Sequence, residues 1–317
     1  MIYSTELLHG WFENKVITLK IMNHKPVAMK QGDLLLFSII ISSFLVFISC
    51  EKEPNHWTSS FDGVEISFDK QGKVSPAIVF VHGWSNNGSV WDEQMAHFSN
   101  KYKVIAIDLG GHGQSGDDRN VWTMSSFGED VIAVINHLKL KKVILVGFSM
   151  GGPVVIEAAK KAPEKIAGLV LVDNLHNIEM KYSEEMIKIS DSIFSNLIAY
   201  PTNEKLINLG FYKNNPEKSF QRVMAMFKDG QRPGWQGSFF EMFKWINEDL
   251  TTSLIEIQSP VISINSNSQP TNIEAFQKYI PSYKVHVMSD VGHLVFWDAP
   301  GEFNNLLEQS IQEFIGN

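Results

Sequence analysis

One stretch near the middle of this 317-residue chain constrains its fold more than any other. There the apolar run Val143-Ile144-Leu145-Val146 leads through Gly147-Phe148-Ser149-Met150-Gly151 into a segment with helical spacing. Glycine two residues before and two residues after a serine permits a turn so tight that larger side chains would collide within it. The pattern predicts a buried strand, a strained turn with Ser149 at its tip, and a helix that begins directly behind the serine.

The chain from residue 58 onward repeats this alternation of short apolar runs and longer helical segments. Buried strands are predicted at Ala77 to Val81, Val104 to Asp108, Val143 to Gly147, Ile166 to Val172, Val261 to Asn265 and Lys284 to Met288. Helices are predicted near Ser126 to Leu138, Gly151 to Lys161, Ile273 to Tyr279 and Gly301 to Ile315. Ser126 and Glu129 have the spacing of a capping box at the start of the first helix. Such alternation is typical of α/β folds with a mostly parallel central sheet flanked by helices.

The strand pattern is interrupted between His176 and about Leu250, where the chain becomes helical in pattern and rich in aromatic residues and methionine. We expect a helical cap over residues 176–255, inserted between a first part of the core at 58–175 and a second part at 256–317. Most of the aromatic side chains are expected to pack the cap onto the core. A minority are expected to line an apolar pocket for a small molecule.

The first fifty residues carry a targeting pattern. The apolar run Leu34 to Ile48 follows Lys30. It is shorter than the ~20 residues that span a hydrocarbon core, but typical of the apolar region of a signal peptide. Phe47-Ile48-Ser49-Cys50 is similar to a bacterial lipobox. We therefore expect a lipoprotein signal peptide at 29–49, lipidation of Cys50 and a polar tether over 50–57. Residues 1–28 are then an upstream extension from a mis-assigned start codon.

An uncleaved anchor helix with an incidental cysteine is the alternative interpretation of this segment. Both interpretations place the folded domain in a bacterial cell envelope, outside the cytoplasmic membrane. The lipid anchor would hold it to a membrane, which is the outer membrane if the cell has two.

Charge and cysteine content exclude several classes of function. The 27 Lys and Arg residues are outnumbered by 35 Asp and Glu, which gives a net charge of -8 and no electrostatic footprint for nucleic acid. Because Cys50 is the single cysteine, the chain cannot form an intramolecular disulfide or a CxxC metal or redox motif. We expect no metal, no cofactor and no nucleic-acid partner.

Four motifs of the chain resemble the α/β-hydrolase family in order and spacing. They are Val79-Phe80-Val81-His82-Gly83-Trp84, the segment Ile107 to Ser115, the turn around Ser149, and Val291-Gly292-His293. The resemblance covers roughly residues 62–175 and 256–317, and it is closest to the branch of capped serine esterases and cofactor-free haloperoxidases. It implies an α/β-hydrolase fold with a helical cap.

The same resemblance implies catalytic roles for particular residues. Ser149 would be the nucleophile, and His293, which follows the last strand, would be the general base that takes its proton. The backbone N–H groups of Trp84 and Met150 would form the oxyanion hole, at the positive end of the helix that begins behind the serine. His82 would organise the loop that carries Trp84.

The acid of the triad departs from the family pattern. In the family it commonly follows the strand that corresponds to Pro260 to Ile264, but the loop Asn265 to Pro270 contains no carboxylate. Asp173 ends the preceding strand at the same edge of the sheet and preserves the chain order serine, aspartate, histidine. We expect Asp173 to be the acid, with a carboxylate oxygen roughly 2.6 to 3.2 Å from His293.

Other partners for His293 remain open at this point. Asp290 lies in the same turn, and Asn267 or Ser268 could hydrogen-bond the imidazole without supplying negative charge. In that case Asp173 would merely cap the entrance of the cap, with His176 as its local partner.

These residues predict a serine hydrolase that cleaves a carboxylic ester or related acyl compound through an acyl-enzyme on Ser149. The expected substrate is small and apolar, and thioester, lactone, carbon–carbon and peroxy chemistry all remain open. The alternative is a lipid-anchored, non-catalytic binding or sensing protein of the same fold, because fold does not fix function. The altered acid position keeps this alternative open.

Overall fold

A computed structural model describes residues 56–227 and 232–316 of the chain. The expected upstream extension at 1–28, the signal peptide at 29–49 and the lipidation site Cys50 lie outside these described residues, as does most of the tether. Within the described ranges, no helix is both long enough and apolar enough to cross a membrane.

An eight-stranded sheet forms the centre of the described domain, in the order β1-β2-β4-β3-β5-β6-β7-β8. The strands are β1 His56–Ser59, β2 Glu65–Gln71, β3 Ala77–Val81, β4 Lys103–Ile107, β5 Val143–Phe148, β6 Ile166–Val172, β7 Val261–Ser266 and β8 Lys284–Met288. The pairs β1/β2 and β2/β4 are antiparallel, and every other neighbouring pair is parallel. The predicted fold class is confirmed, and each of the predicted strands is present with its ends shifted by no more than one residue.

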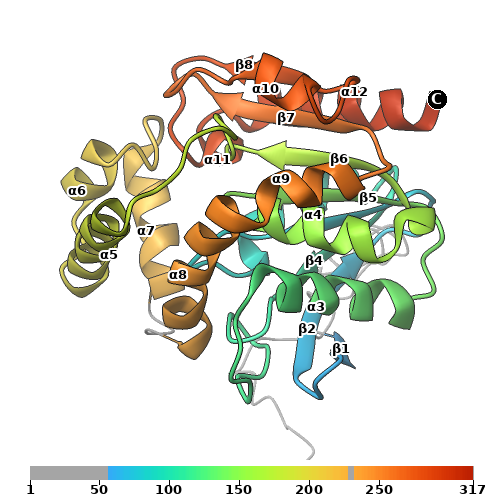
Figure 1. Cartoon of the computed structure of the whole chain (residues 1–317), viewed down its shortest axis with the longest axis horizontal. Coiled ribbons are helices and arrows are strands. Elements are labelled where there is room, and N and C mark those ends of the chain that lie inside the picture. Colours follow the sequence, from blue (N-terminus) through green and yellow to red (C-terminus); the bar gives the residue numbers. More distant parts are fainter. Residues whose placement is uncertain (1–55, 228–231, 317) are drawn as a thin grey trace, which may run out of the picture. The chain divides into compact units, whose positions relative to one another are not determined.

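Helices cover both faces of the sheet (Figure 1). The helices of the described chain are α2 Asp92–Phe98, α3 Met124–His137, α4 Gly151–Lys161, α5 Glu184–Ala199, α6 Asn203–Asn208, α7 Pro216–Phe227, α8 Pro233–Glu248, α9 Leu250–Glu256, α10 Ile273–Gln277, α11 Val295–Asp298 and α12 Pro300–Gly316. Successive residues of a strand point to opposite faces. In β3, Val79 and Val81 therefore pack with α3, α4 and α9, whereas Ile78 and Phe80 pack with α2, α11 and α12.

Two antiparallel strands at one edge of the sheet were not predicted from the sequence. The tether expected over 50–57 is wrong at its end, because His56 and Trp57 belong to β1 and pair with Phe68 and Ser67 of β2. The ring of His56 stacks on that of Phe68, with centroids 5.6 Å apart. An edge strand of four residues with polar side chains carries too few apolar positions to be recognised by pattern.

The start of α3 also differs from the prediction. Thr123, with extended backbone, is the N-cap, and its side chain accepts a hydrogen bond from the N–H of Ser126 at 3.1 Å. The capping box expected at Ser126 and Glu129 is therefore wrong. Ser126 lies inside the first turn, where its hydroxyl donates back to the carbonyl of Thr123 at 2.8 Å. The threonine hydroxyl thereby satisfies one of the N–H groups at the helix start that have no acceptor within the helix.

The segment between β6 and β7 forms helices α5 to α9. In Figure 1, α5 to α8 lie beyond the carboxyl ends of the parallel strands, at the side toward which their arrows point. Helix α9 differs, because Leu250 and Leu254 are buried in the same cluster as Val155 of α4, and Lys160 donates to Ser253 at 3.0 Å. Residues 250–255 of the predicted cap therefore belong to the layer of helices that covers the sheet.

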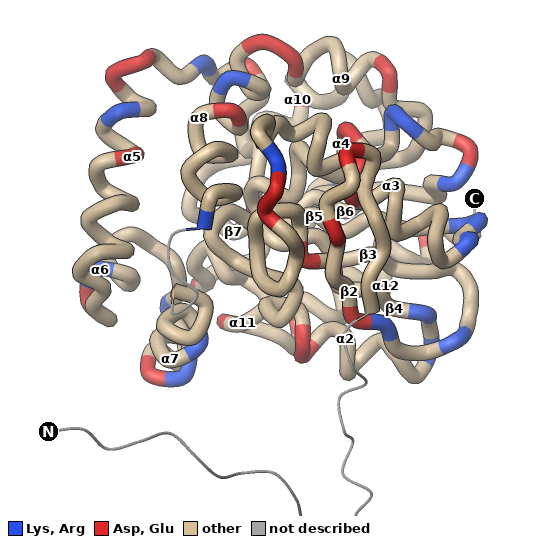
Figure 2. The backbone as a smooth tube through the Cα atoms, turned by 90° about the horizontal axis from the view of Figure 1, so that it is seen from below, with Lys and Arg blue, Asp and Glu red and all other residues tan. Residues whose placement is uncertain are grey.

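Ion pairs tie the cap to the core at α7. Glu93 of α2 accepts from Lys218 at 2.9 Å and from Arg222 at 3.0 Å. Figure 2 shows α7 with charges of both signs close together. The guanidinium of Arg222 also lies over the ring of Trp297 in α11, 4.1 Å from its centroid. These contacts hold α7, at one edge of the cap, against α2 and α11 of the core.

Candidate active site

Ser149 lies at the turn between β5 and α4, as predicted, and its backbone is strained. Its φ of 51° falls in the left-handed region that non-glycine residues rarely adopt. A Cβ atom on Gly147 would lie 2.3 Å from the carbonyl oxygen of Gly151, and one on Gly151 would lie 2.6 Å from that of Val81. Only glycine fits at either position. The turn therefore holds the serine at the carboxyl edge of the sheet.

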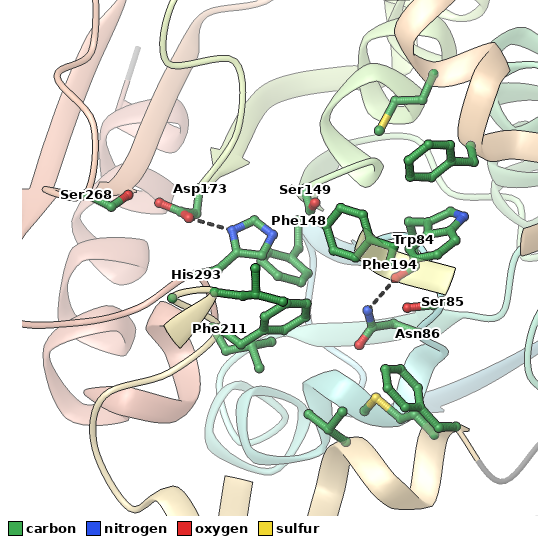
Figure 3. A pocket seen from close by; sticks show the side chains of 18 of the residues that line it. Trp84, Ser85, Asn86, Phe148, Ser149, Asp173, Phe194, Phe211, Ser268 and His293 are labelled. Carbon is green, nitrogen blue, oxygen red and sulfur yellow. Dashed lines mark hydrogen bonds and ion pairs between the residues drawn. The ribbon is translucent and has the colours of Figure 1, made fainter. Parts of the chain in front are cut away.

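His293 and Asp173 are joined by the hydrogen bond that the sequence predicted. Nδ1 of His293 donates to Oδ2 of Asp173 at 2.6 Å, and the carboxylate is 3% exposed (Figure 3). Its other oxygen, Oδ1, accepts the backbone N–H of Ser266 at 2.6 Å. Burial alone would raise the pKa of Asp173, but hydrogen bonds from His176, His293 and Ser266 hold that pKa well below its usual range. The carboxylate is therefore ionised at neutral pH.

The other expected partners of His293 lie elsewhere. Asp290 is exposed and has a φ of 58°, and its backbone carbonyl accepts from the side chain of Asn214. Asn267 and Ser268 are exposed, and the Ser268 hydroxyl pairs with that of Ser266 at 2.6 Å. In the described chain, Asp173 is the residue that occupies Nδ1 of His293.

The cap takes part in holding His293, which sequence reasoning missed. The backbone N–H of His293 donates to the carbonyl of Gly210 at 2.7 Å, and that of Leu294 donates to Phe211 at 2.8 Å. The imidazole packs against Phe148, with centroids 4.7 Å apart, and meets Phe211 edge-on at 6.4 Å. The one sequence signal for this contact is Gly292, where a Cβ atom would lie 2.6 Å from the Cα of Tyr212.

The loop after β3 approaches the serine closely, as the predicted oxyanion hole requires. A Cβ atom on Gly83 would lie 3.0 Å from the Cβ of Ser149. Met150 has helical backbone at the N-terminus of α4. Among the described residues, no backbone hydrogen bond in the turns and loops uses the N–H of Trp84 or Met150. Neither N–H group therefore has a backbone acceptor in this part of the described chain, as a pair of oxyanion donors would require.

Trp84 has a second role that the sequence did not reveal. Its indole Nε1 donates to the carbonyl of Trp235 in α8 at 2.7 Å, and its ring meets those of Phe194 and Phe239 edge-on at 5.5 Å and 5.1 Å. The residue that carries the expected oxyanion donor is therefore also where the cap rests on the core.

His82 organises this loop, as the resemblance implied. Its Nδ1 donates to the carbonyl of Gly83 at 2.8 Å, and its Nε2 accepts the N–H of Leu109 at 3.1 Å. Complete burial lowers the pKa of His82 to about 4. The imidazole is therefore neutral at neutral pH, as the two hydrogen bonds require.

Ser149 and His293 line one cavity of about 400 Å³ beneath the cap. In Figure 3 both side chains face this space, with Phe148 beside the imidazole and Ser85 and Asn86 farther along the wall. Most of the apolar lining residues come from the cap, namely Phe194, Leu209, Phe211, Val223, Met226, Phe227, Phe239, Met242 and Phe243. Among the described residues of the lining, the ionisable side chains are Asp173, His176 and His293, and none is a lysine or arginine. No group of three or more His, Cys, Asp or Glu side chains that could hold a metal occurs in the described ranges.

Characterised relatives of the chain include hydrolases of several kinds. It is 25% identical over 243 residues to 3-oxoadipate enol-lactonase 2 of Acinetobacter baylyi, a match that covers 75% of this chain and 90% of the relative. It is also 25% identical over 225 residues to a bifunctional esterase/perhydrolase of Acinetobacter calcoaceticus, covering 66% of this chain and 80% of that protein.

Solved structures show the same fold at lower identity. An esterase from the thermophile Thermogutta terrifontis superposes with a TM-score of 0.69 at 23% identity, over 82% of this chain and 98% of that one. An esterase from Exiguobacterium antarcticum superposes with a TM-score of 0.70 at 21% identity, over 81% and 98%. The sequence profile of the alpha/beta hydrolase fold family matches residues 76–300. This match spans most of the chain and agrees with the sheet order and with the strained turn at Ser149. The chain therefore belongs to the α/β-hydrolase family.

Proposed function

We propose that this protein is a serine hydrolase that cleaves carboxylic esters through an acyl-enzyme on Ser149. The observation that carries the proposal is the 2.6 Å hydrogen bond between His293 and an ionised, buried Asp173, in the cavity that Ser149 also lines. The esterase and lactonase relatives support acyl chemistry on this fold.

Each residue has a defined task in the proposed reaction. Nε2 of His293 takes the proton of the Ser149 hydroxyl as its oxygen attacks the ester carbonyl, and Asp173 stabilises the imidazolium that forms. The N–H groups of Trp84 and Met150 bind the negative oxygen of the tetrahedral intermediate. The imidazolium then protonates the leaving alcohol, and the same base activates a water molecule that releases the acid and frees the serine.

The lining of the cavity favours a small, apolar and uncharged acyl group. A cavity of about 400 Å³ lies within the range of small-molecule sites. An anionic acyl group would find no lysine or arginine among the described lining residues to offset its lost hydration. Apolar esters of short to medium chain are therefore the substrate class we propose, with lactones and thioesters of similar shape as further members.

Labelling with a fluorophosphonate probe tests the proposed mechanism directly. We expect a covalent adduct on Ser149 and hydrolysis of p-nitrophenyl esters, both lost in Ser149→Ala. Removal of a triad serine costs about 10⁶-fold in kcat in a well-studied case, while the fold is kept. A wild-type protein without adduct or turnover would favour the non-catalytic binder of the same fold.

We also propose that the enzyme is a lipoprotein of the bacterial cell envelope, anchored through Cys50. The support is the lipobox-like sequence alone. Several acyl chains hold firmly to a bilayer, at about 0.8 kcal/mol per buried CH₂. Cys50→Ala should leave the signal unprocessed and remove lipid labelling by a radioactive fatty acid. If both forms stayed membrane-bound and unprocessed to the same extent, an uncleaved anchor would be favoured.

A further inference from the structure

The carboxylate of Asp173 has a second histidine beside it, which the proposed mechanism does not use. While Oδ2 serves His293, Nε2 of His176 lies 3.4 Å from Oδ1. His176 is in the loop after β6, its side chain is 12% exposed, and it lines the same cavity as Ser149. We propose that His176 is a positioning residue that holds the triad acid against His293, an inference that rests on the proposed serine-hydrolase function.

The backbone at this acid is strained, which makes external support of the side chain useful. Asp173 has a φ of 45°, and Leu175, two residues later, has a φ of 47°. Left-handed backbone is unfavourable for a residue with a Cβ atom and persists only where surrounding contacts stabilise it. The carboxylate is held from β7 by the N–H of Ser266 and from its own loop by His176. The loop is in turn fixed to the start of α10, because the carbonyl of His176 accepts the N–H of Asn272 at 2.7 Å.

Among the described residues, no other side chain is paired with Oδ1. The neighbouring loop Asn265 to Pro270, where the family commonly carries its acid, contributes Ser268 and Gln269 to the cavity wall, but neither side chain forms a hydrogen bond with the carboxylate. The hydroxyl of Ser266 is paired with Ser268 and not with the carboxylate. Within the described chain, His176 is thus the side chain besides His293 that approaches the acid.

The contact defines which nitrogen of His176 donates. An ionised carboxylate only accepts hydrogen bonds, so in the proposed contact Nε2 carries a hydrogen. Nδ1 is buried without a hydrogen-bond partner in the described residues. Leaving Nδ1 unpaired carries a free-energy cost that hydrophobic packing alone would not require, because leucine would fill the space without it. Glutamine places an amide N–H at a similar distance from the backbone, whereas leucine fills the space without a donor.

A double-mutant cycle between His176 and Asp173 tests the proposal. We expect His176→Leu to lower kcat for p-nitrophenyl butyrate about tenfold, the lower limit for a hydrogen bond to a charged group, with KM unchanged within about twofold. His176→Gln should recover kcat to within about threefold of wild type. In the Asp173→Asn background, His176→Leu should have no further effect, because residues that act through one another are not additive. An equal loss in both backgrounds, or wild-type kcat in His176→Leu, would overturn the proposal.

A second readout does not depend on turnover. The proton between Nδ1 of His293 and Asp173 should give a downfield ¹H NMR resonance that shifts or broadens in His176→Leu and is kept in His176→Gln. An unchanged resonance in His176→Leu contradicts the positioning role even if no ester is hydrolysed, so the two proposals fail separately. If His176→Leu does not fold, His176→Asn, whose amide is too short to reach Oδ1, takes its place with the same expectations.

Discussion

Two buried aspartates in this protein have opposite surroundings. Asp130 in α3 is wholly buried and is held by two nitrogens of Arg119 at 2.6 and 3.0 Å and by the hydroxyl of Ser60 at 2.5 Å. Arg119, itself buried, also reaches Asp62 at 2.7 Å. Asp173 is almost as buried, but its partners are two histidines that line the cavity and one backbone N–H.

The difference lies in whether the partner can change its charge. A guanidinium keeps its proton throughout the accessible pH range, so the cation that faces Asp130 does not change its charge. Arg119 is also absent from the described lining of the cavity. An imidazole can take up and release a proton during a reaction, and His293 is about one-third exposed, toward the space where substrate would bind. Burial of a carboxylate therefore does not indicate its role, but the chemistry and exposure of its partner do.

The comparison is tested most severely by Asp173→Asn. An amide keeps the shape but presents no negative charge to the imidazolium, so kcat should fall by about 10⁴-fold while the protein stays folded. The measurement is ester hydrolysis together with circular dichroism of the purified variant. Activity within about tenfold of wild type would remove Asp173 from the triad.

Arg119→Met should have the opposite effect. It leaves Asp130 buried without its cation, which costs about 3 to 5 kcal/mol of folding free energy. Urea denaturation measures this loss. The activity of each folded molecule should remain that of wild type, because Arg119 does not line the cavity. Arg119→Lys retains the charge but not the paired geometry, so its free energy of unfolding should lie between those of the wild type and Arg119→Met. Lost turnover in a folded Arg119→Met would show that the two regions are coupled.

A third buried group, the imidazole of His82, should make the stability of the protein depend on pH. The pKa of His82 is about 4 in the folded chain, below its ordinary 6.5, so as pH falls the unfolded chain binds the proton first. The contribution of His82 to stability is complete above pH 6.5 and is lost progressively down to about pH 4, about 3 kcal/mol in all. Denaturation curves across this range measure the effect, and His82→Gln should flatten it. A wild-type curve as flat as that of the variant would contradict burial of a neutral His82.

The smallest expected effect is that of Ser60→Ala, which removes one hydrogen bond from Asp130 and keeps the Arg119 pair. We expect a loss of about 1 to 2 kcal/mol, with no change in kcat. A stability loss as large as that of Arg119→Met would mean that the hydroxyl, and not the cation, keeps the carboxylate buried.

The sequence predicted the parallel part of the fold well because its strands are buried on both faces. β3, β5 and β6 are almost continuous runs of apolar residues, and such runs are visible without an alignment. The edge strand β1 was missed because a four-residue edge strand buries little and is specified by its neighbour β2. The end of the cap was misplaced for a similar reason, since the apolar face of α9 does not say whether it packs on the cap or on α4.

The site was predicted as far as the chain order of Ser149, Asp173 and His293, since strand ends at one edge of a parallel sheet converge. The supports of these residues were not predictable. The contact of His293 with Gly210 joins segments 83 residues apart through backbone atoms, and backbone hydrogen bonds leave no residue-type signal. The indole of Trp84 reaches the carbonyl of Trp235 in the same way. The sequence suggested His176 as a local partner of Asp173 only if Asp173 were not the acid, whereas in the structure Nε2 of His176 lies beside Oδ1 while Oδ2 accepts from His293.

Helices α5 to α8 are inserted in the chain between β6 and β7, which are neighbours in the sheet. Such an insertion suggests a module that recombination could exchange between homologues. The first residues of that insertion argue otherwise, because Asp173 and His176 stand at its entrance and Gly210 inside it holds the backbone of His293. A chimera cut at the end of β6 would exchange the acid together with the pocket. A cut after Ile178, with the segment around Gly210 retained, would change the pocket and keep Asp173, His176 and His293. Recombination at the ends of this insertion therefore changes the substrate pocket and the triad acid together, unless the crossover points are chosen to separate them.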